Sequence, residues 1–493
     1  MGAVTADEMR ALEEAAFQKG ATAASLMTKA GRRLGLAIAR MFPRPGTAVA
    51  YLGKGHNAGD ALVALGVLRA AGWQVVARAS RPLEECADLT RAMFEALGGV
   101  TVLEASPDVV EMPRPLVLLD GLLGIGANGG PRGTLAALSR EMNGLRRTAG
   151  ARVVAVDLPS GVDADTGVVH PDAVIADVTL TIGVPKRGLL QAAAVHAVGA
   201  LGLVPVEELR VPEVGDLALI SPWTLAAGRE PRPFDFHKGR AGRVALLAGS
   251  VPYSGAAVLA ATGALRGGAG LVTLHVPVEA HALIAAKCPP EVMVRPVSDP
   301  RDLLGSRFDS LVVGPGLGEA DGDTLRELLE GCSVPAVIDA DALNALAKCG
   351  GVAGLPSHHV LTPHPGEFAR LAPDLTGQPR EAAARLFADR SSPVLLLKGA
   401  RTLVTAKGKP LWCNSTGTPG MATGGQGDVL SGVIGALLAG GMESLDAAAL
   451  GAWLCGRASE RAIAAGASEE SLSAGDAAAH LGGAFRDWRE GTR

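Results

Sequence analysis

The sequence predicts an α/β fold divided into two domains of similar size. Short apolar runs typical of buried strands alternate with stretches in which apolar residues recur at helical spacing. Glycine-rich loops follow several of these runs, and 65 glycines with only 3% aromatic residues suit tight packing of helices on sheets. A length of 493 residues is too great for one ordinary core, and by itself it suggests about three domains.

Composition narrows the class of protein. With 48% hydrophobic and 19% charged residues, the chain is globular rather than disordered, and a net charge of −4 favours neither a nucleic-acid nor an anionic-membrane partner. The N-terminus carries acids where a signal peptide needs a basic start, and the apolar run 429–441 is too short and glycine-rich to span a bilayer. The six cysteines form no CxxC pair. We therefore expect a cytoplasmic protein with reduced thiols and small-molecule substrates, and a homo-oligomer.

The first half reads as a helical region followed by a parallel sheet. Residues 4–42 have helical spacing, and Thr5 with Glu8 forms a capping box. A strand at 47–53, a glycine loop at 54–60, a helix at 61–72 and a strand at 73–80 form a βαβ unit, which predicts parallel strands. Further strands are expected within three apolar runs, 115–124, 151–161 and 176–183.

A linker divides the halves. Residues 205–236 contain several prolines, and their apolar residues follow neither helical nor strand spacing. We therefore place the domains at 1–225 and 226–493. After the linker, strand and helix patterns alternate again, but they do not repeat the sequence of the first half. The expected helix of this half lies at 256–270, and its expected strands lie within 242–250, 271–277, 310–318, 335–343, 359–368, 394–400 and 401–414.

The loop GGQGD in the second half is a candidate anion site. Gly424, Gly425 and Gly427 leave backbone N–H groups unencumbered, and the apolar run from Val429 predicts a buried helix whose N-terminus faces the loop. Asp428 at that end would repel a phosphate unless it takes a proton from an attacking hydroxyl. It could equally be the N-cap of the helix, and this loop alone does not decide between the two roles.

Other segments of this half also follow apolar strands, where open α/β sheets bind ligands. They are Gly314–Gly318, Thr362–Phe368 and Lys398–Arg401. His364 stands between two prolines and cannot lie inside a helix, so by itself it would be a turn histidine. The segment 339–344 could hold a metal or cap a helix, and capping is the better interpretation of Asp341.

The first half repeats the combination of a loop and an acid. Gly53–Asp60 lacks GxGxxG spacing, so it is not a standard dinucleotide fingerprint, and Asp60 could be only an N-cap and Asn57 only a turn former. Asp120 and Asp157 end two strands, and Ser160 follows closely. Such groups at adjacent strand ends can bind a cation or move a proton. Two further acids, Asp163 and Asp165, are interpreted as surface turn residues.

Several ordered motifs of the second half resemble the ADP-dependent NAD(P)H-hydrate dehydratases. They include VVGPGLG, VIDADALN, LTPHPGEF, LLLKGA and NSTGTPGMATGGQGD, and the resemblance spans about residues 235–490. It implies a ribokinase-like fold, in which ADP, with Mg²⁺, phosphorylates the hydroxyl of the hydrated nicotinamide ring and phosphate then leaves. Asp428 would be the catalytic base. The implied hydrate-binding residues are Ala256, Gly316, His364 and Asp428, and the implied ADP-binding residues are Lys398, Gly399, Ala400, Arg401, Thr402, Gly424, Gly425 and Gly427.

The first half resembles the NAD(P)H-hydrate epimerases over about residues 1–215, through GKGHNAGD, LLDGLLGIGANGGPRG, VVAVDLPSG and TIGVPKRGLL. The resemblance implies a Rossmann-like three-layer domain that interconverts the R and S hydrates, with Asp157 as the site acid. The family loop usually reads GNNGGDG, from which His56, Ala58 and Ala61 depart. The implied potassium ligands are Asn57, Asp120 and Ser160, and the implied substrate-binding residues are His56, Asn57, Ala58, Gly59, Asp60, Gly124, Ile125, Gly126, Ala127, Asn128, Gly129, Gly130 and Asp157.

Both halves thus point to one damaged metabolite, which favours a bifunctional repair enzyme. Two other functions stay open on the sequence. One is a ribokinase-like vitamin or sugar kinase with a regulatory nucleotide-binding domain, and the other is a nucleotide sensor without catalysis. A kinase would convert ATP into a stable phosphorylated product, and a sensor would not need Asp428.

Overall fold

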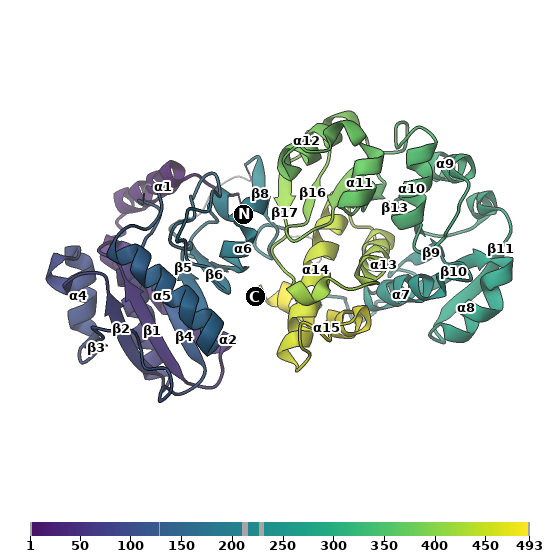
Figure 1. Ribbon diagram of the computed structural model, residues 1–493. Helices are drawn as coiled ribbons and strands as arrows, with labels where there is room; N and C mark the ends of the chain where they lie inside the picture. The colour runs from purple at the N-terminus through teal and green to yellow at the C-terminus, as the bar shows by residue number, and fades with distance from the viewer. Residues whose placement is uncertain (1, 128, 210–214, 226–230, 492–493) are drawn as a thin grey trace. The chain divides into compact units, whose positions relative to one another are not determined.

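The computed structural model describes residues 2–127, 129–209, 215–225 and 231–491, and the chain forms two compact units, Met1–Gly215 and Asp216–Arg493 (Figure 1). The boundary lies ten residues before the expected one at 225/226. The reason is that β8 (Leu217–Leu219), within the expected linker, pairs with β17 (Leu411–Cys413) in the second sheet. Residues 210–214 and 226–230 of that linker lie outside the described residues.

The first unit is built on a seven-stranded sheet in the order β3-β2-β1-β4-β5-β6-β7, in which every neighbouring pair is parallel. The strands are β1 (Thr47–Leu52), β2 (Gln74–Ala79), β3 (Thr101–Val102), β4 (Leu116–Gly121), β5 (Arg152–Val156), β6 (Val178–Ile182) and β7 (Ala200–Val204). The direction in which strands are added reverses between β1 and β4. In doubly wound sheets ligands bind at such a reversal, at the carboxyl ends of the strands.

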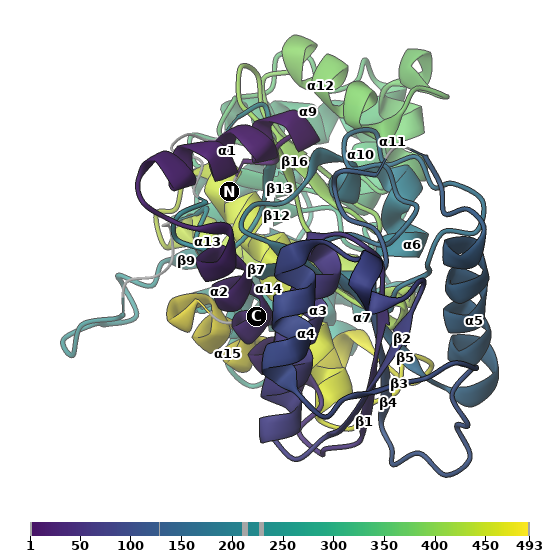
Figure 2. The same ribbon diagram turned by 90° about the vertical axis from the view of Figure 1, so that its left-hand side faces the viewer.

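Helices cover both faces of this sheet. Alternate residues of β1 face opposite sides, so Ala50 joins one core with α2, α3 and α4, while Tyr51 joins another with α5. Figure 2 shows α5 and the α3–α4 pair on opposite sides of the strands. The predicted Rossmann-like three-layer domain is therefore confirmed. The α-helices are α1 (Ala6–Gln18), α2 (Ala23–Met41), α3 (His56–Ala70), α4 (Asp88–Leu97), α5 (Thr134–Ala149) and α6 (Val195–Val198).

Two local predictions in this unit need correction. The helical region 4–42 is two helices, because Gly20 adopts a φ of 95° after α1, and Thr22 then starts α2 with its own capping box. The Thr5–Glu8 capping box is confirmed. The expected loop 54–60 turns helical at His56, with Gly55 as N-cap, so Asp60 lies inside α3 and does not cap it.

The second unit contains a ten-stranded sheet in the order β11-β10-β9-β12-β13-β14-β15-β16-β17-β8. Neighbours from β11 to β15 are parallel, whereas β16 is antiparallel to both β15 and β17. The strand order reverses between β9 and β12. The strands not yet given are β9 (Arg243–Leu247), β10 (Leu271–Pro277), β11 (Val292–Val297), β12 (Ser310–Val313), β13 (Ala336–Ile338), β14 (Val360–Leu361), β15 (Val394–Leu397) and β16 (Leu403–Thr405).

The predicted buried helix of this unit is α13 (Gln426–Ala439), whose residues from Val429 to Ala439 are all buried. It packs closely against α7 (Ser254–Arg266): a Cβ added at Gly432 would lie 2.0 Å from the carbonyl oxygen of Ala260. Within the described residues, no helix is both long enough and apolar enough to cross a membrane. The other α-helices are α8 (His281–Lys287), α9 (Gly322–Gly331), α10 (Ala340–Lys348), α11 (Pro365–Leu371), α12 (Arg380–Arg390), α14 (Ser444–Ala464) and α15 (Ala474–Glu490).

Candidate functional site

The three predicted potassium ligands lie together at the carboxyl end of β4. The Ser160 hydroxyl donates to Asp120 Oδ1 (2.6 Å) and the Ser160 amide to Asp120 Oδ2 (2.7 Å). The Asn57 side chain donates to the carbonyl of Leu123 (3.0 Å), whose amide donates to Ser160 Oγ (2.8 Å). Asp120 is fully buried, and burial raises the pKa of its carboxyl to about 6. The hydrogen bonds from Ser160 lower this pKa but do not offset the effect of burial.

Asp157 ends β5 next to this group and is paired with a lysine that was not among the predicted site residues. The Lys186 side chain is 0% exposed, and its ammonium donates to Asp157 Oδ1 and to the carbonyl of Ile182 (3.0 Å). Asp157 also accepts from the Ile182 amide (2.9 Å) and has a φ of 68°, a conformation that non-glycine residues adopt at a cost. The signal available in the sequence was a lysine just after a strand end, in VPKRG.

Two further carboxyls, those of Asp60 and Glu13, feel the charges of the Asp157–Lys186 pair. Burial raises the pKa of Asp60 well above its ordinary value, and the charges of Asp157 and Glu13 raise it further. Burial also raises the pKa of Glu13, although Lys186 opposes that shift. Glu13 comes from α1 and was not predicted. We call Glu13, Asp60, Asp120, Asp157 and Lys186, together with Asn57 and Ser160, the first site.

The predicted loop after β4 borders the first site. A small pocket is lined by Gly124, Ala127 and Gly129 of this loop and by Ser160 and Gly161 of the loop after β5. Asn128 lies outside the described residues. Of the predicted substrate residues in α3, two face other helices or the core rather than the pocket. Ala58 is fully buried in the hydrophobic core, and a Cβ added at Gly59 would lie 2.4 Å from Met27 Sδ.

Asp163 is a turn residue, as expected. It accepts hydrogen bonds from the amides of Asp165 (3.1 Å) and Thr166 (2.8 Å), and the Thr166 bond is the main reason that its pKa is lowered. Asp165 has an additional role that the sequence did not indicate, because its carboxylate accepts from the amide of Ala6 (2.6 Å) at the start of α1.

In the second unit, Asp428 is the third residue of α13 and not its N-cap. The N-cap is Gly425, with a left-handed φ of 91° and no side-chain hydrogen bond to the helix start, so the capping interpretation of Asp428 was wrong. Burial and, after it, the charge of Asp339 raise the pKa of Asp428 to about 7, while Lys398 opposes the shift. A carboxyl with this pKa can exchange a proton near neutral pH.

Lys398 is held by carboxylates below the glycine loop. Its ammonium donates to Asp339 Oδ1 (2.7 Å) and lies 3.9 Å from Glu367 Oε2, while the Ser431 hydroxyl donates to Asp339 Oδ2 (2.7 Å). Burial lowers the pKa of Lys398, but these carboxylates outweigh it and leave the pKa raised. A Cβ added at Gly427 would lie 3.2 Å from the ammonium nitrogen. We call Asp339, Glu367, Lys398, Asp428 and Ser431 the second site; the sequence analysis singled out only Lys398 and Asp428.

The rest of the predicted ADP segment turns between β15 and β16. The Thr402 hydroxyl donates to the carbonyl of Gly399 (3.0 Å), which closes the turn around Ala400. Arg401 is 3% exposed, so its side chain is directed into the fold. By contrast, a Cβ added at Gly424 would meet no atom within 4 Å, which leaves space beside the N-terminus of α13.

Of the other predicted hydrate-binding residues, Gly316 and His364 follow strands of the second sheet, and Ala256 lies in α7. Gly316 follows β12 with a φ of 63°, and a Cβ there would lie 2.8 Å from the Cβ of Ala256. His364 is the N-cap of α11, and its Nδ1 accepts from the amide of Gly366 (3.0 Å). Asp341 accepts from the amide of Gly318 (2.8 Å), so it fixes the glycine loop after β12 instead of capping a helix as expected.

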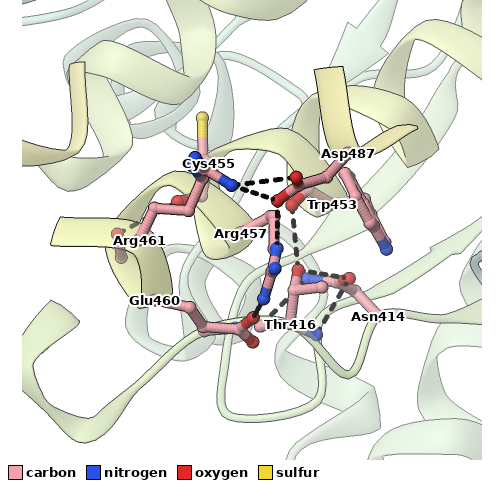
Figure 3. Close-up of polar contacts among 10 residues, drawn as sticks. Asn414, Thr416, Trp453, Cys455, Arg457, Glu460, Arg461 and Asp487 are labelled. Carbon is pink, nitrogen blue, oxygen red and sulfur yellow. Dashed lines mark hydrogen bonds and ion pairs between the residues drawn. The ribbon is translucent and has the colours of Figure 1, made fainter. Parts of the chain in front are cut away.

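A network of buried polar groups fixes the segment that leads to the glycine loop (Figure 3). The amide of Gly417 donates to Glu460 (3.0 Å), which is paired with Arg457 (2.8 Å), and Arg457 in turn binds Asp487 of α15 (2.6 Å). Thr416 donates to the carbonyl of Trp453 (3.0 Å). These bonds anchor residues 414–418 to α14 and α15, which restricts where the following loop can lie.

Comparison with known proteins gives concordant results for the two units. A family model described as NAD(P)H-hydrate dehydratase matches residues 244–478, and one described as YjeF-related protein N-terminus matches residues 23–188. The bifunctional NAD(P)H-hydrate repair enzyme Nnr of Gloeobacter violaceus is 38% identical, over 96% of both chains. The enzyme of the same name from Moorella thermoacetica is 36% identical, over 96% of this chain and 94% of its own.

A solved structure resembles the second unit. It is a ribokinase-like superfamily protein (EF1790) from Enterococcus faecalis V583, with a TM-score of 0.50 and 26% sequence identity. The match covers 57% of this chain and 99% of that protein. The predicted ribokinase-like fold of the second half is therefore confirmed.

Proposed function

This chain belongs to the family of bifunctional NAD(P)H-hydrate repair enzymes, and we propose that it carries out both of the family's reactions. The first unit would epimerise the R and S forms of hydrated NADH or NADPH. The second would dehydrate the S form at the expense of ADP, giving NAD(P)H, AMP and phosphate. The observation that carries this proposal is Asp428, with a pKa of about 7 beside a glycine-flanked helix N-terminus.

In the dehydration, Asp428 takes the proton of the hydroxyl on the hydrated ring carbon. With its pKa raised to about 7, the Asp428 carboxyl can exchange a proton near neutral pH and so can accept the hydroxyl proton. ADP supplies the phosphoryl group that makes this oxygen a good leaving group. Departure of phosphate breaks the carbon–oxygen bond, and loss of a proton from the adjacent carbon restores the ring double bond. Gly316, Ala256 and His364 are proposed to hold the hydrate.

The residues around α13 fit the phosphates of ADP. Gly424, Gly425 and Gly427 leave the free N–H groups of the helix N-terminus accessible, and a helix N-terminus stabilises anions. The turn Lys398–Thr402 is proposed to contact the nucleotide. In the described ranges of the chain, no group of three or more His, Cys, Asp or Glu side chains could hold a metal ion. Mg²⁺ would bind mainly through the phosphates of ADP and keep several waters, and Asp339 and Glu367 are the carboxylates available to hold it.

In the epimerisation, Asp157 takes the proton of the hydroxyl on the hydrated carbon as the bond from that carbon to the ring nitrogen breaks, and Lys186 donates a proton to the nitrogen. The resulting aldehyde recloses on its other face by the reverse proton transfers, which gives the other epimer. The ammonium can donate and the carboxylate can accept, and both are fixed by hydrogen bonds to β6. Potassium would be held by the oxygens of Asn57, Asp120 and Ser160. Its charge would compensate the fully buried Asp120 carboxyl, whose pKa is raised to about 6 by burial. A cytoplasmic location and a homo-oligomeric state remain predictions.

The test is the recovery of NADH absorbance from a mixture of R and S NADH hydrate with purified chain, Mg²⁺, K⁺ and ADP. We expect full recovery coupled to release of phosphate. Recovery that stops after the S form is consumed, and then continues at the spontaneous epimerisation rate, would restrict the function to dehydration. No recovery with ADP or ATP, together with a stable phosphorylated product from another small molecule, would favour the ribokinase-like kinase instead.

A further inference from the structure

The proposed ADP-binding turn lies against the guanidinium group of Arg380. This arginine is the first residue of α12, and its Nη2 donates to the carbonyls of Lys398 (3.1 Å) and Leu397 (3.4 Å). A Cβ added at Gly399 would lie 2.5 Å from the same nitrogen. The absence of a side chain at Gly399 thus leaves room for the guanidinium beside the turn.

Arg380 lacks an anionic partner of the kind that Arg390 and Arg457 have in this unit. Among the described residues no carboxylate forms an ion pair with it, and its buried Nε has no hydrogen-bond partner. Arg457 is paired with both Glu460 and Asp487, and Arg390, at the other end of α12, is paired with Asp374 (2.6 Å). Burial of Arg380 without such a partner is unfavourable and lowers its pKa.

The second site needs positive charge before it can accept a diphosphate. Its ammonium group, on Lys398, already faces Asp339 and Glu367, and Asp428 adds a third carboxyl nearby. Arg401 is too deeply buried to supply the charge, being 3% exposed. Arg380 is a cation at the same turn, and a guanidinium matches phosphate oxygens with paired donors.

We propose that Arg380 binds the diphosphate of ADP, next to Gly399, and supplies the positive charge that Lys398 does not. The inference rests on the proposed dehydratase function and deepens it. Arg380 then recognises the phosphates of the nucleotide, whereas Lys398 orients the carboxylates around Asp428.

The test compares Arg380→Gln and Arg380→Lys with Arg390→Gln in the full chain. Arg390 is a matched control because it lies on the same helix and pairs with an exposed carboxylate away from the turn. Loss of a charge-assisted bond of about 1.5–3 kcal/mol predicts a KM for ADP raised about 10- to 100-fold in Arg380→Gln. Arg380→Lys should show a smaller increase. The KM for the hydrate in all three variants, and the KM for ADP in Arg390→Gln, should match the wild type.

Calorimetric titration with ADP and with adenosine separates recognition of phosphate from a structural role. Arg380→Gln retains a side-chain amide that can donate to the Lys398 carbonyl, so it removes the charge while keeping that bond. We expect the Kd for ADP to rise as the KM does, and the Kd for adenosine to stay unchanged. Equal weakening of both would overturn the proposal and leave Arg380 as a support of the turn.

The two proposals fail in different ways. If the wild-type chain shows no ADP-dependent recovery of NADH, the dehydratase function itself is wrong. If the wild type is active and Arg380→Gln has a normal KM for ADP, only the role of Arg380 is wrong. If Arg380→Gln does not fold, Arg380→Lys carries the same comparison of ADP with adenosine.

Discussion

Each unit has an aspartate in its proposed site, but the charged groups around the two aspartates are arranged differently. Asp157 is in direct contact with the buried ammonium of Lys186 and with the Ile182 amide. Asp428 has carboxylate neighbours, and Lys398, which opposes the rise in its pKa, is engaged by Asp339. Burial and the neighbouring carboxylates raise the pKa of Asp428 to about 7, which favours its protonated form below that pH.

The comparison shows that the proton chemistry of an aspartate depends on the charged groups and hydrogen-bond donors around its carboxyl group. A carboxylate held by an ammonium forms an acid–base pair that suits a reversible exchange at one centre. A carboxyl whose pKa is raised to near 7 suits the abstraction of one proton from a hydroxyl that is about to be phosphorylated. Four predictions test this contrast and the two sites around it.

The largest expected effect is that of Asp428→Asn on dehydration. Removing the proton acceptor should lower kcat for NADH recovery from the S hydrate by at least about a hundredfold. Epimerisation, followed without ADP by chromatography of the R and S forms, should be unchanged. A smaller loss in kcat would contradict the role of Asp428 as base, and a parallel loss of epimerisation would contradict two independent sites.

The second-largest effect is expected for Lys186→Met, on the stability of the first unit and on epimerisation. Lys186→Met leaves the Asp157 carboxylate buried without its cation, which should cost about 3–5 kcal/mol of unfolding free energy. Epimerisation should fall by about a hundredfold or more, while dehydration of the S form continues. Denaturant unfolding monitored by circular dichroism measures the loss of unfolding free energy, and separate assays of epimerisation and dehydration measure the two activities. The double variant Asp157→Asn/Lys186→Met, which removes both charges, should regain most of the stability and none of the activity.

A smaller effect concerns the stability of the second unit as a function of pH. The folded-state pKa of Asp428, about 7, lies above its ordinary value of 3.8. The contribution of this carboxyl to stability is thus fully present below about pH 4 and is lost as pH rises through about 7. Asp428→Asn should therefore be more stable than the wild type by about 1–3 kcal/mol at pH 8 and no more stable at pH 4. Thermal unfolding at the two pH values is the measurement; an identical difference at both would refute the shifted pKa.

The smallest effect is expected at Ala58. This departure from the family loop is fully buried in the core of the first unit, inside α3. Ala58→Gly should lower the unfolding free energy by about 1 kcal/mol, because glycine disfavours helix, and should leave epimerisation within about twofold. A large gain in epimerisation rate would show instead that the extra Cβ hinders the substrate. Ala61→Gly, in the same helix, is the matched control.

Local patterns in the sequence were sufficient for the elements of the fold. The strand at 47–53, the capping box of Thr5 and Glu8, and the buried helix after Gly427 each depend on residues a few positions apart. Ordered motifs also indicated the family and the acids Asp157 and Asp428. The three residues proposed for potassium, Asn57, Asp120 and Ser160, lie together at the carboxyl end of β4.

The α/β class, the two units and the acids Asp157 and Asp428 could therefore be predicted from residue patterns alone. The ion pairs within the two sites could not, because they depend on the fold. Lys186 and Asp157 are 29 residues apart, and Lys398 and Asp339 are 59 apart, so no local period connects them. The edge strand Leu217–Leu219 likewise pairs with Leu411–Cys413, far along the chain. Charge and burial act through space, and the position of one residue relative to another in space is fixed by the sheet rather than by their spacing in the sequence.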